Sequence, residues 1–210
     1  MLASILSNQR LFFSNIFYHS TLLALKELSD KPRFIQSWLV SSREKSQRFQ
    51  KMEDRELVLR FFAFRHIDRY VEQSMSTIKE FLDLYMKKSL AFNDEDIKFL
   101  KIIFKETLEL AHSIYGDQPF KPLWLDETQS KRNLIFYKEY YDAVMVGLSN
   151  HRDDIDILIE RKNEILKATE ELLMEDKAQI FTGKGGKKED IQARINRFDR
   201  MLSQIINSRV

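Results

Sequence analysis

Apolar residues recur at intervals of three and four along most of the chain, and this spacing is the feature that most restricts its fold. One such run joins Ile97, Leu100, Phe104, Leu108 and Ala111, which places all five on one face of an α-helix. Only five glycines and three prolines interrupt the 210 residues, so the sequence offers few places for turns. We therefore predict an all-α protein, a multi-helix bundle with a C-terminal antiparallel helical hairpin.

Helix-starting and helix-ending residues divide the chain into predicted helices. Asn93 is a good N-cap residue, and Gly116 can adopt the left-handed conformation that ends a helix. We expect a helical bundle over residues 1–150 and a long αα-hairpin over residues 151–210, packed on the bundle or projecting from it. The predicted helices cover about 8–28, 32–39, 53–69, 76–89, 93–116, 130–148, 153–181 and 188–207.

The apolar stripes of the last two helices predict how they pack. Ile191, Ile195, Phe198, Leu202 and Ile205 repeat at the spacing of a coiled-coil seam. A matching seam in the preceding helix contains these residues: Ile155, Leu158, Lys162, Ile165, Thr169 and Leu172. Two helices with matching seams, joined by a few residues, are expected to form an antiparallel pair.

Residues 181–190, FTGKGGKKED, join those two helices and contain three of the five glycines. Glycines beside lysines are typical of anion-binding loops, because backbone amides can approach an anion where no side chain intervenes. A P-loop, however, separates two glycines by four residues and continues with Lys and Ser or Thr, which this segment does not. We interpret the segment as the hairpin tip, where glycines accept positive φ. A loose electrostatic contact between the lysines of this segment and nucleic acid is the alternative interpretation.

Several classes of chemistry are excluded or disfavoured by the sequence. The chain has no cysteine, which excludes disulfides, zinc thiolate sites and a cysteine nucleophile, and a reducing compartment such as the cytoplasm is expected. Its apolar runs are far shorter than the roughly 20 residues that span a bilayer, so we expect no membrane partner. Glu109 and His112 form a single Glu-x-x-His pair, where a di-iron bundle needs two. We expect no catalytic residue, no metal site and no cofactor.

Charge is distributed unevenly along the chain. Residues 31–70 hold ten basic against five acidic residues, and residues 177–210 hold eight against three. Between them, residues 91–130 and 149–176 are acidic. These segments could be solvated faces that pair with one another, or the basic ones could form a face for nucleic acid.

The candidate nucleic-acid contacts come from the two basic segments and from an aromatic helix within the first. Arg60 could instead pair with neighbouring acidic residues such as Glu56. Aromatic residues beside arginines can also stack on bases, although phenylalanines at helical spacing are more often core. The seven residues that we predict to contact nucleic acid are Arg55, Arg60, Lys184, Lys187, Lys188, Arg194 and Arg197.

Five stretches resemble, in order, the C-terminal helical region of the GmrSD-type restriction family, bacterial phage-defence proteins whose first domain has a ParB/sulfiredoxin-like fold. They are KMEDRELVLRFFAFR at 51–65, FLDLYMKK at 81–88, YGDQPFK at 115–121, YYDAVMVGLS at 140–149 and GKGGKKEDIQARINRF at 183–198. The resemblance runs from about residue 50 to the C-terminus. None of these stretches carries catalytic residues in the family.

The resemblance implies a supporting role rather than catalysis. Members of the family hydrolyse nucleotide with a domain marked by Asp-Gly-Gln-Gln-Arg, and this chain contains neither that signature nor a His-Asn-His nuclease domain. The expected function is a non-catalytic helical accessory domain that docks on a ParB-like NTPase domain or a nuclease subunit and contributes to DNA engagement. The alternative is a stand-alone helical protein-interaction domain with no nucleic-acid role.

A homodimer is a further expectation, because the N-terminal segment is rich in large apolar residues. Phe12, Phe13, Ile16 and Phe17 lie together in the first predicted helix. If the surface that a missing domain would cover is exposed, such a helix is a natural dimer contact.

Overall fold

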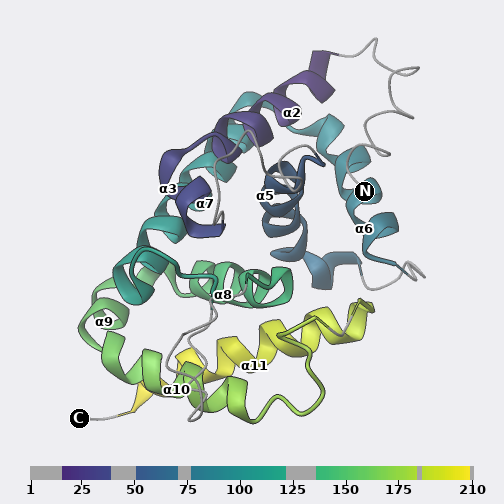
Figure 1. Ribbon diagram of the computed structural model, residues 1–210. Coiled ribbons are helices and arrows are strands. Elements are labelled where there is room, and N and C mark those ends of the chain that lie inside the picture. Colours follow the sequence, from purple (N-terminus) through teal and green to yellow (C-terminus); the bar gives the residue numbers. More distant parts are fainter. Residues whose placement is uncertain (1–15, 39–50, 71–76, 122–135, 184–185, 209–210) are drawn as a thin grey trace. The chain divides into compact units, whose positions relative to one another are not determined.

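The computed structural model describes residues 16–38, 51–70, 77–121, 136–183 and 186–208 (Figure 1). All regular secondary structure in these ranges is helical, which confirms the all-α prediction. The chain divides into two compact units, Met1–Glu106 and Thr107–Val210, and this division differs from the boundary predicted at residue 150. None of the described helices combines the length and apolar character that crossing a bilayer requires.

The helices of the first unit follow the predicted order. The N-terminal helix is described from Ile16, so residues 8–15 of the prediction, with Phe12 and Phe13, lie outside the described residues. The described elements are α2 (Ile16–Ser29), α3 (Pro32–Trp38), α5 (Glu53–Phe64), the 3₁₀ turn η2 (Ile67–Tyr70), α6 (Ile78–Lys88), the 3₁₀ turn η3 (Ser89–Ala91) and the first part of α7 (Asp94–Tyr115).

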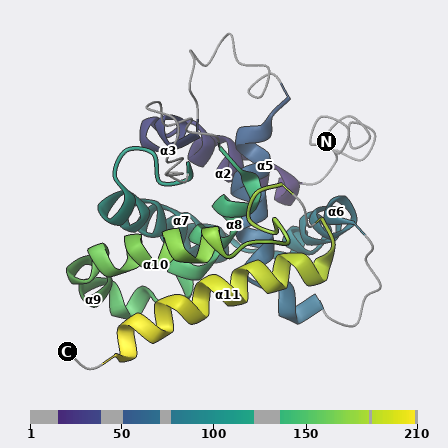
Figure 2. The same ribbon diagram turned by 60° about the horizontal axis from the view of Figure 1, so that its bottom comes forward.

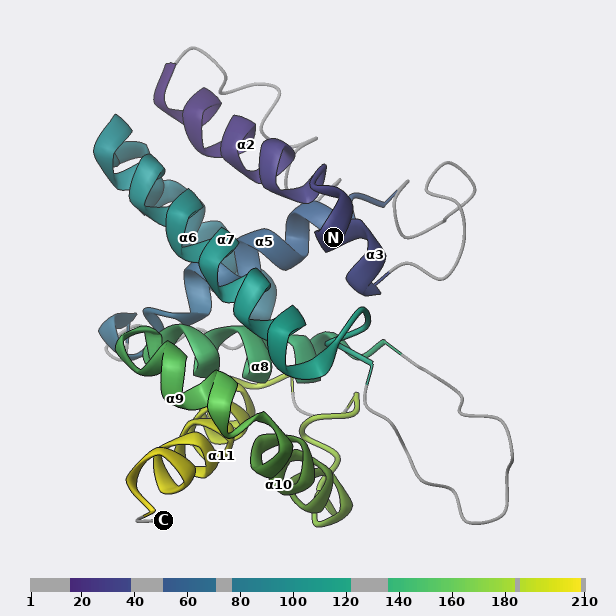
Figure 3. The same ribbon diagram turned by 90° about the vertical axis from the view of Figure 1, so that its left-hand side faces the viewer.

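Helix α5 forms the core of the first unit. Residues 56–64 of this helix are all buried, as expected of a helix that is apolar on nearly every side. Phe104 of α7 meets the rings of Phe34 and Phe61 edge-on, with centroid separations of 5.4 Å in both pairs. Beside this core α2 runs along the first part of α7 (Figure 3), where the Glu27 carboxylate lies 3.6 Å from the Lys105 ammonium.

The caps of α7 match the sequence prediction. The side-chain oxygen of Asn93 accepts a hydrogen bond from the backbone nitrogen of Asp96 at 2.9 Å, and the Asp96 carboxylate accepts one from the Asn93 nitrogen at 2.9 Å. This reciprocal pair satisfies two backbone donors at the start of the helix. The helix ends at Tyr115, and Gly116 follows with φ of 78°, a conformation that glycine adopts without strain.

The second unit is built around α8. Its helices are the remainder of α7, α8 (Lys138–Asn150), the 3₁₀ turn η4 (Arg152–Asp154), α9 (Ile155–Glu160), α10 (Lys162–Met174) and α11 (Lys188–Asn207). Residues 140–149 of α8 are all buried, and α11 packs along this helix. Gly147 permits the close approach, because a Cβ atom there would lie 2.6 Å from Cδ1 of Phe198.

Helices α10 and α11 form the predicted antiparallel hairpin (Figure 2). All five residues of the stripe predicted on α11 are buried. In the other arm Leu158, Ile165 and Thr169 are buried, whereas Lys162 is exposed, so its place in the seam was wrong. Helix α11 packs more extensively on α8 than on α10, which makes the hairpin one side of a three-helix arrangement.

The first arm of the hairpin is shorter than predicted. The expected helix over 153–181 is divided at Arg161 and ends at Met174, and the connection to α11 takes up residues 175–187. The buried Asp176 explains this ending, because its carboxylate accepts hydrogen bonds from the backbone nitrogens of Ile180 at 3.1 Å and Phe181 at 2.9 Å. A side chain that binds the backbone in this way offers it an alternative to the helical pattern.

The start of α8 also differs from the prediction. A helix from Ser130 would include Phe136 and Tyr137, yet Tyr137 is extended, with φ of −114° and ψ of 125°. The extended backbone brings the Phe136 ring to 6.4 Å from that of Tyr141, inside the core. In the first unit, α5 likewise stops at Phe64 and the chain continues as η2.

Candidate nucleic-acid interface

The seven basic residues predicted to contact nucleic acid are divided between the two units. Arg55 and Arg60 lie on α5 in the first unit. Lys187, Lys188, Arg194 and Arg197 lie at the start of α11 or within it, in the second unit. Lys184 lies outside the described residues. The α11 group, with four of the described cations at or within one helix, is therefore the larger of the two.

Arg60 is an interior residue of the first unit. Only 3% of its surface is exposed, its guanidinium lies 3.6 Å from the Glu56 carboxylate, and it stands 5.1 Å above the centre of the Phe64 ring. This ion pair with Glu56 is the alternative to nucleic-acid contact that the sequence indicated for Arg60. Arg55, one turn earlier, is half-buried, and one of its terminal nitrogens lies 4.0 Å from the Met52 sulfur. A guanidinium held like that of Arg60 has no surface to offer a phosphate.

Arg194 is also an interior residue, although it sits in the most basic part of the sequence. Its side chain and that of Asp142 on α8 are both fully buried, with 3.0 Å between the guanidinium nitrogen and the carboxylate oxygen (0% exposed in each case). Its other terminal nitrogen donates to the carbonyl oxygen of Ile180 at 3.4 Å. The structure thus places Arg194 where it joins α8, α11 and the 175–187 connection, and we leave it out of the surface considered for DNA.

Arg197 occupies the border between interior and solvent. Its side chain is 31% exposed, its guanidinium lies 3.7 Å from the buried Asp176 carboxylate, and it stands 5.5 Å above the Phe181 ring. These contacts fix the turn that ends the first arm of the hairpin. Arg197 can reach a phosphate only with the part of its side chain that remains exposed.

Lys187 and Lys188 stand at the start of α11. Lys187 is exposed and occupies the N-cap position, where its backbone nitrogen donates to the Asp190 carboxylate at 3.3 Å. Lys188 is half-buried and begins the helix. Gly183, earlier in the same connection, has φ of 111°, as expected for a glycine in a chain reversal. The two lysines extend from the positive end of a helix of 20 residues.

Helix α11 also presents a row of exposed residues that sequence reasoning missed. They are Ala193, Asn196, Arg200, Gln204 and Asn207, which we call the exposed row of α11. Spacings of three and four place them on one face, which continues to the exposed Glu189, and the five residues include one cation and three amides. The signal was present in the sequence, because these residues fill the gaps in the buried stripe.

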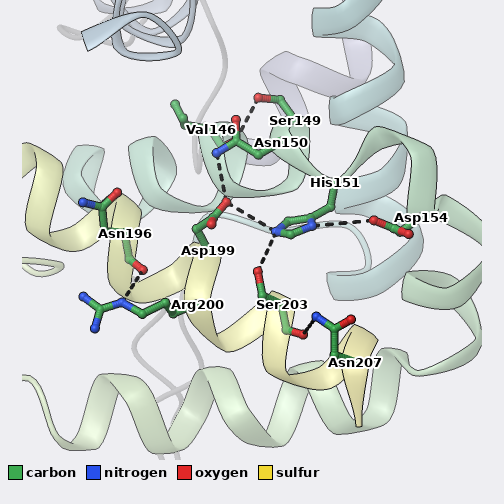
Figure 4. Close-up of polar contacts among 10 residues, drawn as sticks. All are labelled: Val146, Ser149, Asn150, His151, Asp154, Asn196, Asp199, Arg200, Ser203 and Asn207. Carbon is green, nitrogen blue, oxygen red and sulfur yellow. Dashed lines mark hydrogen bonds and ion pairs between the residues drawn. The ribbon is translucent and has the colours of Figure 1, made fainter. Parts of the chain in front are cut away.

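A polar cluster around His151 holds α11 against the end of α8 (Figure 4). The Nε2 atom of His151 lies 3.3 Å from the Asp199 carboxylate and 3.5 Å from the Ser203 hydroxyl, and its Nδ1 atom lies 3.7 Å from the Asp154 carboxylate. Asn150 donates to Asp199 at 2.9 Å. Asp199 and Ser203 turn towards His151, so one flank of α11 is fixed to the end of α8 and to η4.

The same cluster superficially resembles a Ser-His-Asp triad. A triad needs its serine and its aspartate hydrogen-bonded to opposite nitrogens of the histidine ring. Here Asp199 competes with Ser203 for Nε2, and the 3.7 Å between Asp154 and Nδ1 exceeds hydrogen-bond distance. We therefore assign the cluster a role in positioning α11.

A second polar cluster lies inside the same unit. The hydroxyl groups of Tyr115 on α7 and Thr169 on α10 are 3.0 Å apart, and Tyr115 also hydrogen-bonds to Tyr140 on α8. Burial raises the pKa of Tyr115 above its ordinary value of 10.0 and raises the pKa of Tyr140 well above the same value. Both groups are therefore neutral at physiological pH; Tyr140 is buried and Tyr115 half-buried, and both act as hydrogen-bonding structural residues.

Metal binding has no support among the described residues. They contain no group of three or more histidine, aspartate or glutamate side chains arranged to hold an ion. Glu109 is exposed and His112 half-buried on α7, as a solvated helix face would place them.

Comparisons with known proteins add no relative to this description. No protein-family model, no curated protein and no solved structure matches the chain.

Proposed function

We propose that this chain is a non-catalytic helical accessory domain that contributes DNA contacts to a GmrSD-like, modification-dependent restriction protein in the cytoplasm. The resemblance of the sequence stretches between residue 51 and residue 198 to that family motivates the proposal. In this role the chain docks on a ParB-like NTPase domain or a nuclease subunit, which supplies the reactive groups.

The observation that carries the DNA part of the proposal is the position of Lys187 and Lys188. Both lie at the start of a long helix, beside the exposed row with its one cation, Arg200. The nearby Arg194 is committed to a buried ion pair, whereas Lys187 and Arg200 are exposed and Lys188 is half-buried. Ammonium groups at a helix N-terminus favour the approach of a phosphate.

Salt dependence of DNA binding tests this proposal. The affinity of the chain for a duplex of arbitrary sequence should fall steeply as salt rises, because each neutralised phosphate releases counterions. Charge reversal of both lysines, Lys187→Glu with Lys188→Glu, should weaken binding and reduce the slope of log affinity against log salt by roughly two. Lys162→Glu is the matched control, because Lys162 is exposed on α10, outside the proposed surface. No retention of duplex DNA at low salt removes the DNA role.

The accessory role is tested separately by nucleotide turnover. We expect the purified chain alone to hydrolyse no nucleotide, and we expect turnover when a ParB-like NTPase domain of a GmrSD-type protein is supplied with it. Hydrolysis by the chain alone contradicts the accessory role, whatever the outcome of the DNA assay.

A protein-interaction domain without a nucleic-acid role is the second candidate. Exposed aliphatic side chains favour it, with Ile159 of α9 at 41%, Leu166 of α10 at 37% and Met174 at 61%. These residues lie in the acidic segment 149–176, which would suit a basic protein better than DNA. This candidate would be favoured if the chain fails to bind DNA and if the Leu166→Glu variant loses the binding of a partner protein.

A further inference from the structure

The exposed row of α11 is rich in amides, with Asn196, Gln204 and Asn207 among its five residues. Its one charged residue, Arg200, lies between Asn196 and Gln204, and the exposed Glu189 precedes the row on the same face. Arg200 donates from Nε to the carbonyl oxygen of Asn196 at 3.3 Å, and the structure records no ion pair for it among the described residues. The side chains of Asn196 and Gln204 likewise have no hydrogen bond within the described part of the chain.

These side-chain types match the edges of DNA bases. An amide carries a donor and an acceptor side by side, which fits the N6 and N7 positions of adenine, and a guanidinium carries two parallel donors that fit O6 and N7 of guanine. We propose that the exposed row of α11 lies in the major groove of duplex DNA and reads base edges, an inference that rests on the proposed DNA role.

The dimensions of α11 suit this placement. The row extends over about 20 Å of helix axis at 1.5 Å per residue, and a helix with its side chains fits the major groove, which is about 12 Å wide. Asn196, Arg200 and Gln204 are four residues apart, so successive side chains rise by roughly 6 Å, close to the span of two base pairs. Lys187 and Lys188 at one end of the helix are positioned for phosphates.

The buried side of α11 holds the row in a fixed orientation. Phe198 packs against Gly147, and Arg194 is paired with Asp142, so two contacts along the helix lock it to α8. Base reading requires such a rigid support, because hydrogen bonds to base edges tolerate little displacement. Figure 4 shows Asn196 and Arg200 extending away from the His151 cluster, free of the contacts that fix the opposite flank.

The carboxylates closest to the row are engaged with other residues. Asp199 is held by His151 and Asn150, and Asp190 accepts a hydrogen bond from the backbone of Lys187. Glu189 lies one turn before Ala193 and marks the end of the row. Carboxylates that lie at the end of the row, or that are hydrogen-bonded to other residues, repel a phosphate backbone less than carboxylates within the row would.

The test is selection of duplex DNA of randomised sequence by the intact chain. Wild-type protein should enrich a preferred sequence from the pool. The variants Asn196→Ala, Arg200→Ala and Gln204→Ala should each lower the ratio of affinity for the enriched duplex to affinity for a scrambled one, by roughly tenfold for a lost bidentate contact. Arg33→Ala is the matched control, because it removes the same charge from an exposed residue of α3.

Each outcome separates this inference from the proposed function. Salt-dependent binding without any enriched sequence overturns base reading and leaves the DNA role intact, whereas absence of binding overturns both. Base reading by this row is also overturned if wild-type protein enriches a sequence and the three variants, with unchanged thermal unfolding, keep the same affinity ratio for it. Equal binding of duplex RNA overturns it as well, because the A-form major groove is too narrow to admit a helix.

Discussion

The buried ion pair between Arg194 and Asp142 yields the sharpest prediction. We expect the substitution Arg194→Met to destabilise the protein severely, although Arg194 lies in a basic segment that would suggest a surface role. The guanidinium and carboxylate are 3.0 Å apart and completely shielded from water. Methionine fills much of the same space, so the substitution removes the charge while leaving the Asp142 carboxylate without its ion partner.

The expected loss is about 3 to 5 kcal/mol in the free energy of unfolding, the range for removing one partner of a buried pair. A typical domain has only about 5 to 15 kcal/mol in total, so the variant should be marginally folded. If the stranded carboxylate causes the loss, the double variant Asp142→Val with Arg194→Met should recover roughly 2 kcal/mol or more, because it leaves no buried charge.

Urea denaturation followed by circular dichroism measures both variants, with the midpoint and the slope fitted together. A loss below roughly 1 kcal/mol for Arg194→Met would show that the pair is more accessible to water than its geometry indicates. A double variant less stable than the single one would refute the account in terms of an unpaired charge. The same measurement is also a control for the DNA assay. Charge reversal at Arg194 would abolish DNA binding by unfolding the protein, so a loss of binding in that variant would say nothing about a DNA contact.

Two further predictions concern the interior of the second unit. Gly147→Ala should lower the free energy of unfolding by about 1 to 3 kcal/mol, because the new Cβ would lie 2.6 Å from the Phe198 ring. Thermal unfolding measures the change. A gain of about 1 kcal/mol, which alanine usually brings to a helix, would refute the prediction. The raised pKa values of Tyr115 and Tyr140 mean that the folded state holds these protons more tightly than the unfolded state, so their contribution to stability is present below pH 10.0 and lost as pH rises above it. Urea titrations between neutral and alkaline pH should show this loss, and it should be smaller for Tyr140→Phe.

Local features were predictable because they depend on residues near each other in the chain. The capping pair at Asn93, the positive φ of Gly116 and the buried stripe of α11 all follow from spacings of three and four residues. The antiparallel hairpin follows from two such stripes joined by a glycine-containing segment. Gly183 in the connection has the positive φ that was expected, but the connection begins earlier than predicted, after Met174 and beside the buried Asp176.

The candidate interface was predictable only in part. Lys187 was correctly expected to remain at the surface, but charge counting could not separate it from Arg194, seven residues further on. The exposed row of α11 escaped attention because its residues are mostly uncharged, and a search for basic clusters does not weigh amides.

The sequence by itself determined that this protein is helical, where most of its helices lie and which face of α11 is apolar. Only the tertiary structure decided that Arg60 and Arg194 are interior residues and that α8 is buried along its length. The physical reason is that helical periodicity tells which residues share a face but not what covers that face. The partner of Arg194 is Asp142, 52 positions earlier in the chain, and only folding brings the two charges together.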